Sequence, residues 1–527
     1  MAKSGIMVRM SPNLPPLIEA LLAPQRYPGG MPRVELVQTH ISWVLLAGEF
    51  AYKIKKPLKL PFLDYSTLAL RLACCQEELR LNQRYAPDIY LDVIGIGNTA
   101  QDPRLDGAGP AIEYAVRMRR FDCDGQLDRL CVRGELLPAH LSDLAGTLAA
   151  FHETAAIAPV ASRFGTPAQV MAPARDNFRD LWPWLPAPAL QARLLALQHW
   201  TEAQASQLQP LMLVRQQSGR VRECHGDLHL ANLVLLNDRV RLFDCIEFND
   251  DLRWIDVACE MAFPYVDLLA HRQPGLAGWF LNEVLSHSGD YQAAWLLRFY
   301  AVYLALVRAK VAAIRSGQTH ADQGEAIAHL ALAEQLTAPP PQRLVITHGL
   351  SGCGKTVACS QWLQADPQAA TLCLRADVER KRLFGLPGAA HSASAVNAGI
   401  YTADAHNQTY GQLLALANSL LRAGWSVLVD ATFLKRADRD QFRDLARQTG
   451  AAFAILAPSA TPEQLRARIL ARAAFGHDAS EATLAVLAQQ MREIEPLQAD
   501  EGPVLTTPEG PDHADKKKPR APDRLRG

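Results

Sequence analysis

His225-Gly226-Asp227-Leu228-His229-Leu230-Ala231-Asn232 is the stretch that decides how the first part of this 527-residue chain folds. It leads into an apolar run at 233–236, a turn signal at Asn237-Asp238 and a second apolar run at 240–243. Two short β-type runs around such a turn predict a hairpin. The hairpin returns the chain to Asp244, so the loop and this aspartate are expected to meet at one place.

The polar residues of this stretch have a spacing that suits phosphoryl transfer from a nucleoside triphosphate. That reaction needs a base at the acceptor hydroxyl and oxygen ligands that hold Mg²⁺ against the phosphates. We predict Asp227 as the catalytic base, with Asn232 and Asp244 as metal ligands. His225 is predicted to orient the loop. Each residue taken alone also has a structural explanation, since Asn favours turns and Asp caps helices.

The segment before this loop has the pattern of a small sheet with one helix. Residues 34–37, 43–47 and 50–55 are β-type, and residues 68–85 have helical apolar spacing. From about residue 140 onward, helical patterns dominate. We therefore predict a bilobal α+β domain, with a sheet lobe followed by a larger helical lobe.

The strand at 50–55 offers two lysines that could reach the phosphates. Lys53 and Lys55 lie on the same strand face, because side chains alternate with period two. A partner glutamate is expected from the following helix, where Glu77 and Glu78 both occur. We predict Lys53 with Glu78, and we keep Lys55 and Glu77 as alternatives.

Residues 30–310 resemble the aminoglycoside phosphotransferase and choline kinase branch of the kinase-like fold, in which HGDLHxxN replaces the HRDxxxxN loop of protein kinases. That branch needs no standard glycine-rich loop, and Gln38-Thr39-His40-Ile41-Ser42 stands in its place here. The resemblance implies ATP and Mg²⁺ as cofactors. It also implies a hinge near Ile112–Met118, where the backbone at Met118 would meet adenine. An antibiotic acceptor does not follow from it.

A composition break at Ala338-Pro339-Pro340-Pro341 divides the chain, because three prolines cannot continue a helix. The end of the chain is rich in Pro, Gly and charge, a composition too polar to form a core. The predicted organisation is an N-terminal segment at 1–30, a kinase-like domain at 31–337, a Pro-rich linker at 338–342, a P-loop NTPase domain at 343–502 and a disordered basic tail at 503–527.

Gly349-Leu350-Ser351-Gly352-Cys353-Gly354-Lys355-Thr356 fits G-x-x-x-x-G-K-[ST] at every fixed position, between a predicted strand and a predicted helix. Short strands alternate with helices on both sides of it, which predicts an α/β domain with a parallel sheet. Glycines permit close approach of phosphate, and successive N–H groups attract it. The predicted nucleotide-binding residues are Gly349, Ser351, Gly352, Cys353, Gly354, Lys355 and Thr356.

Lys355 is predicted to reach the β- and γ-phosphates, and the Thr356 hydroxyl to bind Mg²⁺. Asp430 ends the strand at 426–429, where the carboxyl end of a parallel strand meets the ligand crevice. We predict Asp430 as a Mg²⁺ carboxylate, with a helix cap as the alternative. Asp377 and Arg380 lie one helical turn apart and are predicted to accept the acceptor's proton and to hold an anionic group; a surface ion pair is the alternative.

Arg468 and Arg472 sit four residues apart on one helix face, as in a lid that carries guanidinium groups to developing phosphoryl charge. Solvated helix charges are the alternative. With the motifs above, this half resembles the small P-loop kinases and ATPases, a group that includes gluconate-kinase-like, zeta-toxin-like and polynucleotide-kinase-like proteins. The order of both halves resembles bacterial aminoglycoside phosphotransferase-like proteins fused to a P-loop domain.

The composition excludes several classes of protein. Lys plus Arg and Asp plus Glu both total 54, so no global basic field favours nucleic acid or an anionic membrane. Ten cysteines without a C-x-x-C pair, and an N-terminus without an apolar signal core, lead us to expect a cytoplasmic protein with reduced thiols. The longest apolar stretch is too short to cross a bilayer.

The leading hypothesis is a tandem ATP-dependent phosphotransferase with a small-molecule hydroxyl acceptor in each half. One alternative is that one domain only binds nucleotide and regulates the other. A weaker alternative makes the C-terminal half a polynucleotide 5′-kinase. The sequence identifies neither acceptor, and it leaves the oligomeric state open.

Overall fold

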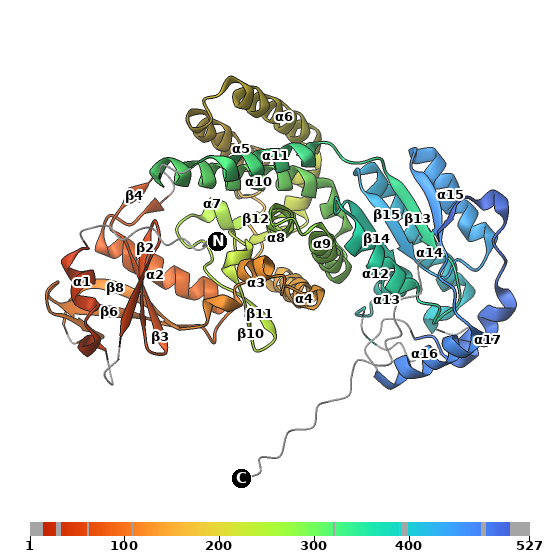
Figure 1. Ribbon diagram of the computed structural model, residues 1–527, viewed down its shortest axis with the longest axis horizontal. Helices are drawn as coiled ribbons and strands as arrows, with labels where there is room; N and C mark the ends of the chain where they lie inside the picture. Colours follow the sequence, from red (N-terminus) through yellow and green to blue (C-terminus); the bar gives the residue numbers. More distant parts are fainter. Residues whose placement is uncertain are drawn as a thin grey trace, which may run out of the picture. The chain divides into compact units, whose positions relative to one another are not determined.

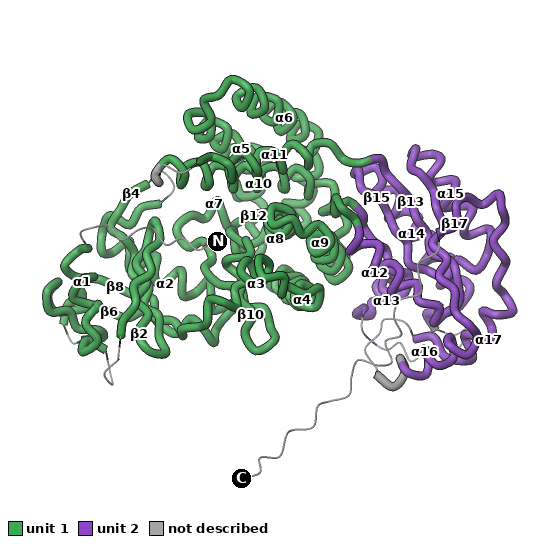
Figure 2. Tube along the Cα trace, in the orientation of Figure 1, with its two compact units in different colours: residues 1–340, 366–370 green, residues 341–365, 371–527 purple. Residues whose placement is uncertain are grey.

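The computed structural model describes residues 14–27, 33–60, 63–107, 109–319, 322–388, 390, 399–475 and 481–505, with only the backbone at 318, 319, 399 and 472–475. The chain divides into two compact units (Figure 2). Unit 1 comprises residues 1–340 and 366–370, and unit 2 comprises residues 341–365 and 371–527. The first 13 residues lie outside the described part, as does the tail predicted at 503–527 from residue 506 onward. Val504 and Leu505, at the start of that predicted tail, form a short strand paired with residues 455 and 456.

Unit 1 begins with a six-stranded antiparallel sheet of order β1-β2-β3-β8-β6-β7 (Figure 1). Its strands are β1 (Val34–Gln38), β2 (Ser42–Ala47), β3 (Phe50–Lys55), β6 (Tyr90–Asn98), β7 (Pro103–Leu105) and β8 (Ala111–Arg119). A small hairpin pairs β4 (Lys59–Leu60) with β5 (Leu63–Asp64). Helix α2 (Leu68–Gln83) contacts β6 and β8, the inner strands of the sheet.

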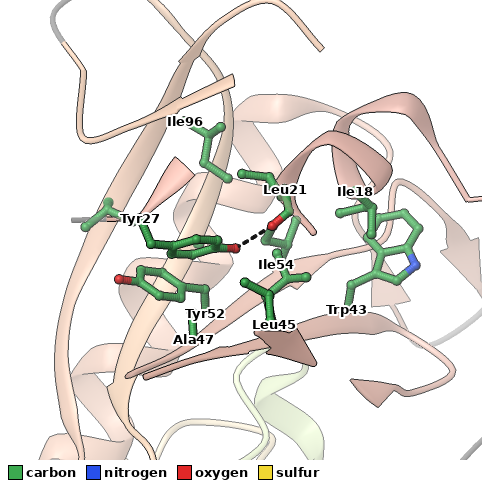
Figure 3. Packing of buried hydrophobic residues seen from close by; sticks show 12 residues of the cluster. Ile18, Leu21, Tyr27, Trp43, Leu45, Ala47, Tyr52, Ile54 and Ile96 are labelled. Atoms are coloured by element: carbon green, nitrogen blue, oxygen red, sulfur yellow. Dashed lines mark hydrogen bonds between the residues drawn. The ribbon is translucent and has the colours of Figure 1, made fainter. Parts of the chain in front are cut away.

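Helix α1 (Pro16–Leu21) packs on the sheet through an apolar cluster with strands β2 and β3 (Figure 3). Ile18 and Leu21 are fully buried in one cluster with Tyr52 and Ile54 of β3. The Tyr27 hydroxyl donates a hydrogen bond to the Leu21 carbonyl oxygen at 2.9 Å, which closes the helix end over the cluster. Because strand side chains alternate, the two lysines of β3 lie on the opposite face.

The helical lobe of unit 1 supplies the walls of the first site. Its helices are α3 (Leu127–Arg133), α4 (Pro138–Thr154), α5 (Pro167–Leu181), α6 (Pro188–Gln217), α7 (Asp250–Arg253), α8 (Val257–Ala270), α9 (Pro274–Ser288), α10 (Ala294–Thr319) and α11 (Gly324–Thr337). Strand β9 (Val221–Glu223) pairs with β12 (Trp254–Asp256). The hairpin β10 (Leu233–Leu236) and β11 (Arg239–Leu242) turns at Asn237-Asp238, where both residues have positive φ, as a type I′ turn requires.

Unit 2 is a five-stranded parallel sheet of order β14-β15-β13-β16-β17. The strands are β13 (Arg343–Thr347), β14 (Thr371–Arg375), β15 (Ser426–Asp430), β16 (Ala452–Leu456) and β17 (Val504–Leu505). The helices are α12 (Lys355–Ala365), α13 (Ala376–Leu383), α14 (Ala403–Arg422), α15 (Arg436–Thr449), α16 (Pro462–Phe475) and α17 (Leu484–Glu493). The carboxyl ends of β13 and β15 are adjacent, so residues that follow these two strands meet there.

The predicted fold class is confirmed: an α+β kinase-like unit precedes an α/β unit with a parallel sheet. The strand predicted at 50–55 has those limits in the structure. Strands β6 and β7 and helix α1 were not predicted. Among the described helices, none contains an apolar run long enough to cross a membrane.

Candidate active sites

Two lysines of β3 share one glutamate of α2. Lys53 Nζ donates to Glu78 Oε1 at 2.8 Å, and Lys55 Nζ donates to Glu78 Oε2 at 2.7 Å. The Glu78 side chain is fully buried. Burial alone would raise its pKa, but the two ammonium groups lower the pKa of Glu78 to about 2. The structure therefore brings both candidate lysines to the predicted glutamate.

The second partners of the two lysines differ. Lys53 Nζ also contacts Asp244 Oδ1, whereas Lys55 Nζ contacts Glu247 Oε1 and lies 3.3 Å from the Tyr65 hydroxyl. Lys55 is completely buried in this second set of partners, which the sequence analysis did not identify. Burial alone would lower the pKa of Lys53, but the surrounding carboxylates hold it well above its usual value. Lys53 is thus the lysine beside the predicted metal aspartate.

Glu77, the alternative to Glu78, faces away from the lysines. Its carboxylate accepts hydrogen bonds from Arg80 at 2.6 Å and from Arg253 at 2.9 Å. Arg253 follows the Asp244 segment along the chain, and it also donates to Glu223 at 3.3 Å. Glu77 is therefore part of an ion-pair network that joins α2 to the helical lobe.

His225 ties the loop at 225–232 to the end of the hairpin. Its Nε2 lies 2.8 Å from the Phe243 carbonyl oxygen, and its Nδ1 accepts the Asp227 backbone N–H at 3.3 Å. These partners assign the proton to Nε2. Burial lowers the pKa of His225, which keeps the ring neutral at pH 7. The imidazole thus links the Asp227 backbone to the end of the hairpin at Phe243.

The loop geometry requires glycine at position 226. Gly226 has φ of +87°, and a Cβ there would lie 2.6 Å from the Leu252 carbonyl oxygen. Asp244 also has positive φ, at +65°, which is rare for a residue with a side chain. Strained backbone of this kind is concentrated at functional sites. The strained position is Asp244, one of the carboxylates of the first site, and Gly226 directly precedes another, Asp227.

Asp227 is partly exposed at the centre of the loop. Asn232 Nδ2 donates to the Asp227 carbonyl oxygen at 2.9 Å and to Asp227 Oδ2 at 3.3 Å. His229 Nε2 lies 3.5 Å from the same carboxylate. Burial would raise the pKa of Asp227, but His229 and its hydrogen bond lower it to about 2. The carboxylate is therefore ionised throughout the neutral range.

The residues predicted to hold Mg²⁺ fit that ion. Asp244 keeps its side chain 44% exposed, and Asn232 directs its amide nitrogen to Asp227, so an amide oxygen and a carboxylate are the available ligand types. Hard oxygen donors suit Mg²⁺.

Met118, the residue predicted to meet adenine, lies in β8 opposite Ala51 and Tyr90. Its side chain packs against the apolar cluster that includes Val234 of the hairpin.

A buried glutamate that the sequence analysis missed supports the same loop. Glu260 Oε1 accepts the backbone N–H groups of His225 and Gly226, and its Oε2 lies 2.7 Å from His152 Nε2. His152 is buried between helices, and through Glu260 it also supports the loop that carries Asp227.

In unit 2 the phosphate-binding motif forms the turn between β13 and α12. Lys355 Nζ donates to the carbonyl oxygens of Gly349 at 3.0 Å and Leu350 at 2.9 Å, so the side chain folds back and its ammonium group contacts the loop that carries it. The Thr356 hydroxyl donates to Asp430 Oδ2 at 2.8 Å. Burial raises the pKa of the Asp430 carboxyl. A hydroxyl and a carboxylate side by side also fit Mg²⁺.

Helices α16 and α17 hold the other side of this loop. Gly352 has φ of +86°, and a Cβ there would lie 3.0 Å from the Leu465 carbonyl oxygen of α16. The buried Cys353 side chain packs with Leu465 in one apolar cluster. The Ser351 N–H donates to Gln490 Oε1 of α17 at 2.8 Å. Gln490 was not predicted, because no pattern near the motif indicates it.

A cleft of about 850 Å³ opens beside the loop. It brings together the predicted residues Ser351, Gly352, Gly354, Lys355, Thr356, Asp377, Arg380, Asp430 and Arg468. Arg380 Nη1 lies 3.3 Å from Asp377 Oδ1, and its guanidinium lies 5.1 Å from the Tyr401 ring centroid. The predicted i,i+3 pair is therefore formed, and it faces the cleft.

Arg468 is the lid arginine that reaches the loop. Its Nη1 lies 3.4 Å from the Gly352 carbonyl oxygen. Arg472 belongs to the same helix, but its side chain lies outside the described residues, as do residues 476–480. Pairing of the two arginines at the phosphates stays a prediction.

Comparison with known proteins agrees with this division of the chain. Residues 126–278 match the phosphotransferase enzyme family, and residues 344–497 match an AAA domain. An uncharacterised protein of Mycobacterium tuberculosis is 29% identical over 463 residues, which cover 87% of this chain and 90% of that protein.

Two solved structures are among those that the chain matches. An aminoglycoside phosphotransferase from Alicyclobacillus acidocaldarius is 14% identical, with a TM-score of 0.37, and the match covers 62% of this chain and 94% of that one. A sugar kinase from Janibacter sp. is 20% identical, with a TM-score of 0.23, and the match covers 32% and 86%. From the two family matches, the chain is a kinase that joins a domain of the phosphotransferase enzyme family to a P-loop domain of the AAA type.

Proposed function

We propose that this kinase is a tandem phosphotransferase, in which each unit binds Mg-ATP and transfers the γ-phosphate to a hydroxyl acceptor. One observation carries the proposal: each unit holds its own lysine, Lys53 or Lys355, beside its own oxygen donors for a metal ion. All residues of each set belong to the same unit. Two complete sets of phosphate-handling groups support two nucleotide sites.

In unit 1, Asp227 would act as the base. The acceptor oxygen forms a bond to the γ-phosphorus, the bond from that phosphorus to the β,γ-bridging oxygen breaks, and Asp227 takes the acceptor's proton. Lys53 would bind the α- and β-phosphates, and Asn232 and Asp244 would hold Mg²⁺. A bound Mg²⁺ neutralises negative charge on the phosphate oxygens. Adenine would meet the backbone at Met118.

In unit 2, Lys355 would exchange its two carbonyl partners for phosphate oxygens. Thr356 and Asp430 would hold Mg²⁺, and Arg468 would bring positive charge to the transferring group. Asp377 would accept the proton of the acceptor, and Arg380 would hold an anionic part of that acceptor. The roles of the glycines and of Ser351 and Cys353 are to shape the loop around the phosphates.

A small molecule is the better acceptor for unit 2 than nucleic acid. Among the described residues, the cleft walls include five acidic residues and four lysines or arginines. The acidic set is Asp377, Asp430, Asp438, Glu481 and Glu493, and the basic set is Lys355, Arg380, Lys435 and Arg468. A groove that follows a polyanion needs an excess of positive charge. A regulatory role for one unit is the other alternative.

Calorimetric titration with ATP and Mg²⁺ tests the proposal without knowledge of either acceptor. We expect two sites in the wild type, one in Lys53→Ala, one in Lys355→Ala and none in the double variant. The exposed Lys59 gives the control Lys59→Ala, which should keep two sites. A single site that only Lys355→Ala removes would identify unit 1 as a domain that does not bind nucleotide.

A further inference from the structure

A small cavity of about 120 Å³ adjoins Asp227 inside unit 1. Helices α5, α8 and α10 form most of its wall, and the loop residues Gly226, Asp227 and Leu228 close one side. The apolar lining includes Val170, Pro173, Phe263, Leu304 and Val307. An acceptor must place its hydroxyl at Asp227, so this cavity is the structural candidate for the rest of the acceptor.

Three other carboxylates line the cavity, and two of them are buried and already hydrogen-bonded inside the protein. Arg215 donates two hydrogen bonds to Asp256, each at 2.8 Å, and both side chains are buried. Glu260 is paired with His152 at 2.7 Å and accepts two backbone N–H groups of the loop. Neither carboxylate can serve a cationic ligand without losing these partners, and breaking a buried pair is costly.

The third carboxylate, Asp251, is paired as well. Arg163 donates to it at 3.0 and 2.9 Å, in a bidentate arrangement. This pair is exposed and correspondingly weak. The described lining of the cavity therefore offers a polyamine no cluster of carboxylates without partners.

Two phenol hydroxyls supply the polar recognition. Tyr300 and Tyr303 line the cavity from α10, and among the described residues no hydrogen bond engages either hydroxyl. Burial raises the pKa of both phenols, so each remains a neutral donor and acceptor. Groups of this kind suit a neutral hydroxyl or carbonyl.

The size of the cavity sets a limit on the ligand. An apolar cavity of roughly 150 Å³ is large enough for benzene, so a cavity of about 120 Å³ accommodates at most the body of about one ring. A polycationic aminoglycoside with several sugar rings would extend far beyond this space. We propose that unit 1 takes a small, uncharged hydroxyl compound with an apolar body of about one ring, held in the cavity with its hydroxyl at Asp227. This inference rests on the proposed function of the same site, since it names the substrate class.

In the transfer step, the alcohol oxygen forms the bond to the γ-phosphorus and the bond to the β,γ-bridging oxygen breaks. Asp227 receives the alcohol proton, and the products are a phosphate monoester and ADP. No other co-reactant is required.

The probe is 2-phenylethanol, which carries one ring and a neutral hydroxyl. Its binding to the full chain is measured by saturation-transfer NMR, and its phosphate monoester is followed by ³¹P NMR with Mg-ATP. Val307→Phe fills the cavity, and the matched control Val311→Phe makes the same change one turn later on α10, where Val311 is 43% exposed. We expect at least tenfold weaker binding in Val307→Phe and unchanged binding in Val311→Phe.

A second variant tests the inference even if Val307→Phe fails to fold. Tyr303→Phe keeps the ring and removes the hydroxyl, so it should weaken binding of 2-phenylethanol severalfold and leave binding of ethylbenzene unchanged.

Kanamycin and choline serve as the charged probes. Choline is the more stringent of the two, because aromatic faces attract quaternary ammonium groups.

Equal binding of 2-phenylethanol to the two valine variants, or its failure to bind the wild type, would overturn the inference. Asp227-dependent phosphorylation of kanamycin or choline would overturn the uncharged class. Val307-sensitive binding of 2-phenylethanol without ATP binding at Lys53 would keep the cavity as a ligand site and refute the kinase role of unit 1. Failure of the inference and failure of the proposed function are thus separate outcomes.

Discussion

Lys53 lies 2.8 Å from Glu78, and that glutamate holds Lys55 with its other oxygen. One fully buried carboxylate thus anchors two adjacent cations on the same strand face. The period-two pattern of β3 places both lysines there, which is why the sequence left them as alternatives. Their remaining partners distinguish them: Lys53 contacts Asp244, and Lys55 contacts Glu247.

Substitution of the two lysines should therefore have different consequences. Lys53→Ala is expected to reduce unit 1 activity by about 100-fold or more, because it removes a phosphate-binding cation. It should cost less stability than loss of Lys55, because Glu78 keeps Lys55 as a partner and Asp244 is 44% exposed. Lys55→Met leaves buried carboxylates without their partner and should cost about 3–5 kcal/mol of unfolding free energy. Urea unfolding and single-turnover rates separate the two effects. An equal loss of stability in both variants would contradict this division.

Gly226→Ala should destabilise unit 1 and remove its activity. In this variant an alanine must adopt the positive φ of Gly226, and its Cβ would lie 2.6 Å from the Leu252 carbonyl oxygen. Gly134→Ala is the matched control, since Gly134 has φ of +72° and nothing within 4 Å of the added Cβ. The control should cost about 1–2 kcal/mol from backbone conformation alone. Thermal unfolding measures the loss of unfolding free energy in each variant, and the difference between the two losses is the cost of the clash at position 226. Equal losses would mean that the loop shifts to accommodate the added Cβ.

Local sequence spacing was sufficient to predict the residues that stand close together along the chain. Asp227 and Asn232 lie in one loop, and the hairpin length brings Asp244 back to them, so chain geometry alone unites the three. In the same way, the strand before Gly349 and the helix after Thr356 predicted the phosphate loop.

Residues that meet only through tertiary packing could not be predicted in this way. Glu260 reaches the loop from α8, and Gln490 reaches Ser351 across 139 positions of sequence. Neither has a local pattern, because a lone Glu or Gln on a helix is ordinarily a surface residue. Helix α1 was missed for a similar reason: six residues carry little periodicity, and only the apolar face of the sheet shows why they are buried.

The ionised state of Asp227 gives a pH prediction. Its pKa is lowered to about 2 in the folded protein, against about 3.9 for an unperturbed aspartate. Ionised Asp227 therefore stabilises the fold above pH 4, and that stabilisation is lost as the pH falls toward 2. The difference in unfolding free energy between wild type and Asp227→Asn should shrink between pH 4 and pH 2. Urea unfolding at pH 5 and pH 3 measures it, and a difference independent of pH would refute the shift.

The Thr356 hydroxyl, which contacts Asp430, should matter for metal and nucleotide binding in unit 2. Thr356→Val is expected to weaken Mg²⁺-dependent ATP binding there by about 10- to 100-fold. Ser360→Ala removes a hydroxyl from the next turn of α12, where it donates only to the Thr356 carbonyl oxygen, and should leave binding unchanged. Calorimetry in a Lys53→Ala background isolates this site. Equal effects of the two variants would indicate a role for Thr356 in helix packing.

Arg468 provides the corresponding test of transition-state stabilisation in unit 2. It is exposed, lies 3.4 Å from the Gly352 carbonyl oxygen and lines the cleft, so Arg468→Ala should leave the fold intact. If its guanidinium meets the transferring phosphoryl group, the variant should lower the turnover rate by about 1,000-fold while changing ATP affinity much less. Arg466→Ala is the control, because Arg466 is exposed on the same helix and does not line the cleft. ATP turnover in a Lys53→Ala background measures both. If Arg466→Ala and Arg468→Ala reduced turnover equally, the effect would come from helix charge, and Arg468 would have no specific contact with the transferred group.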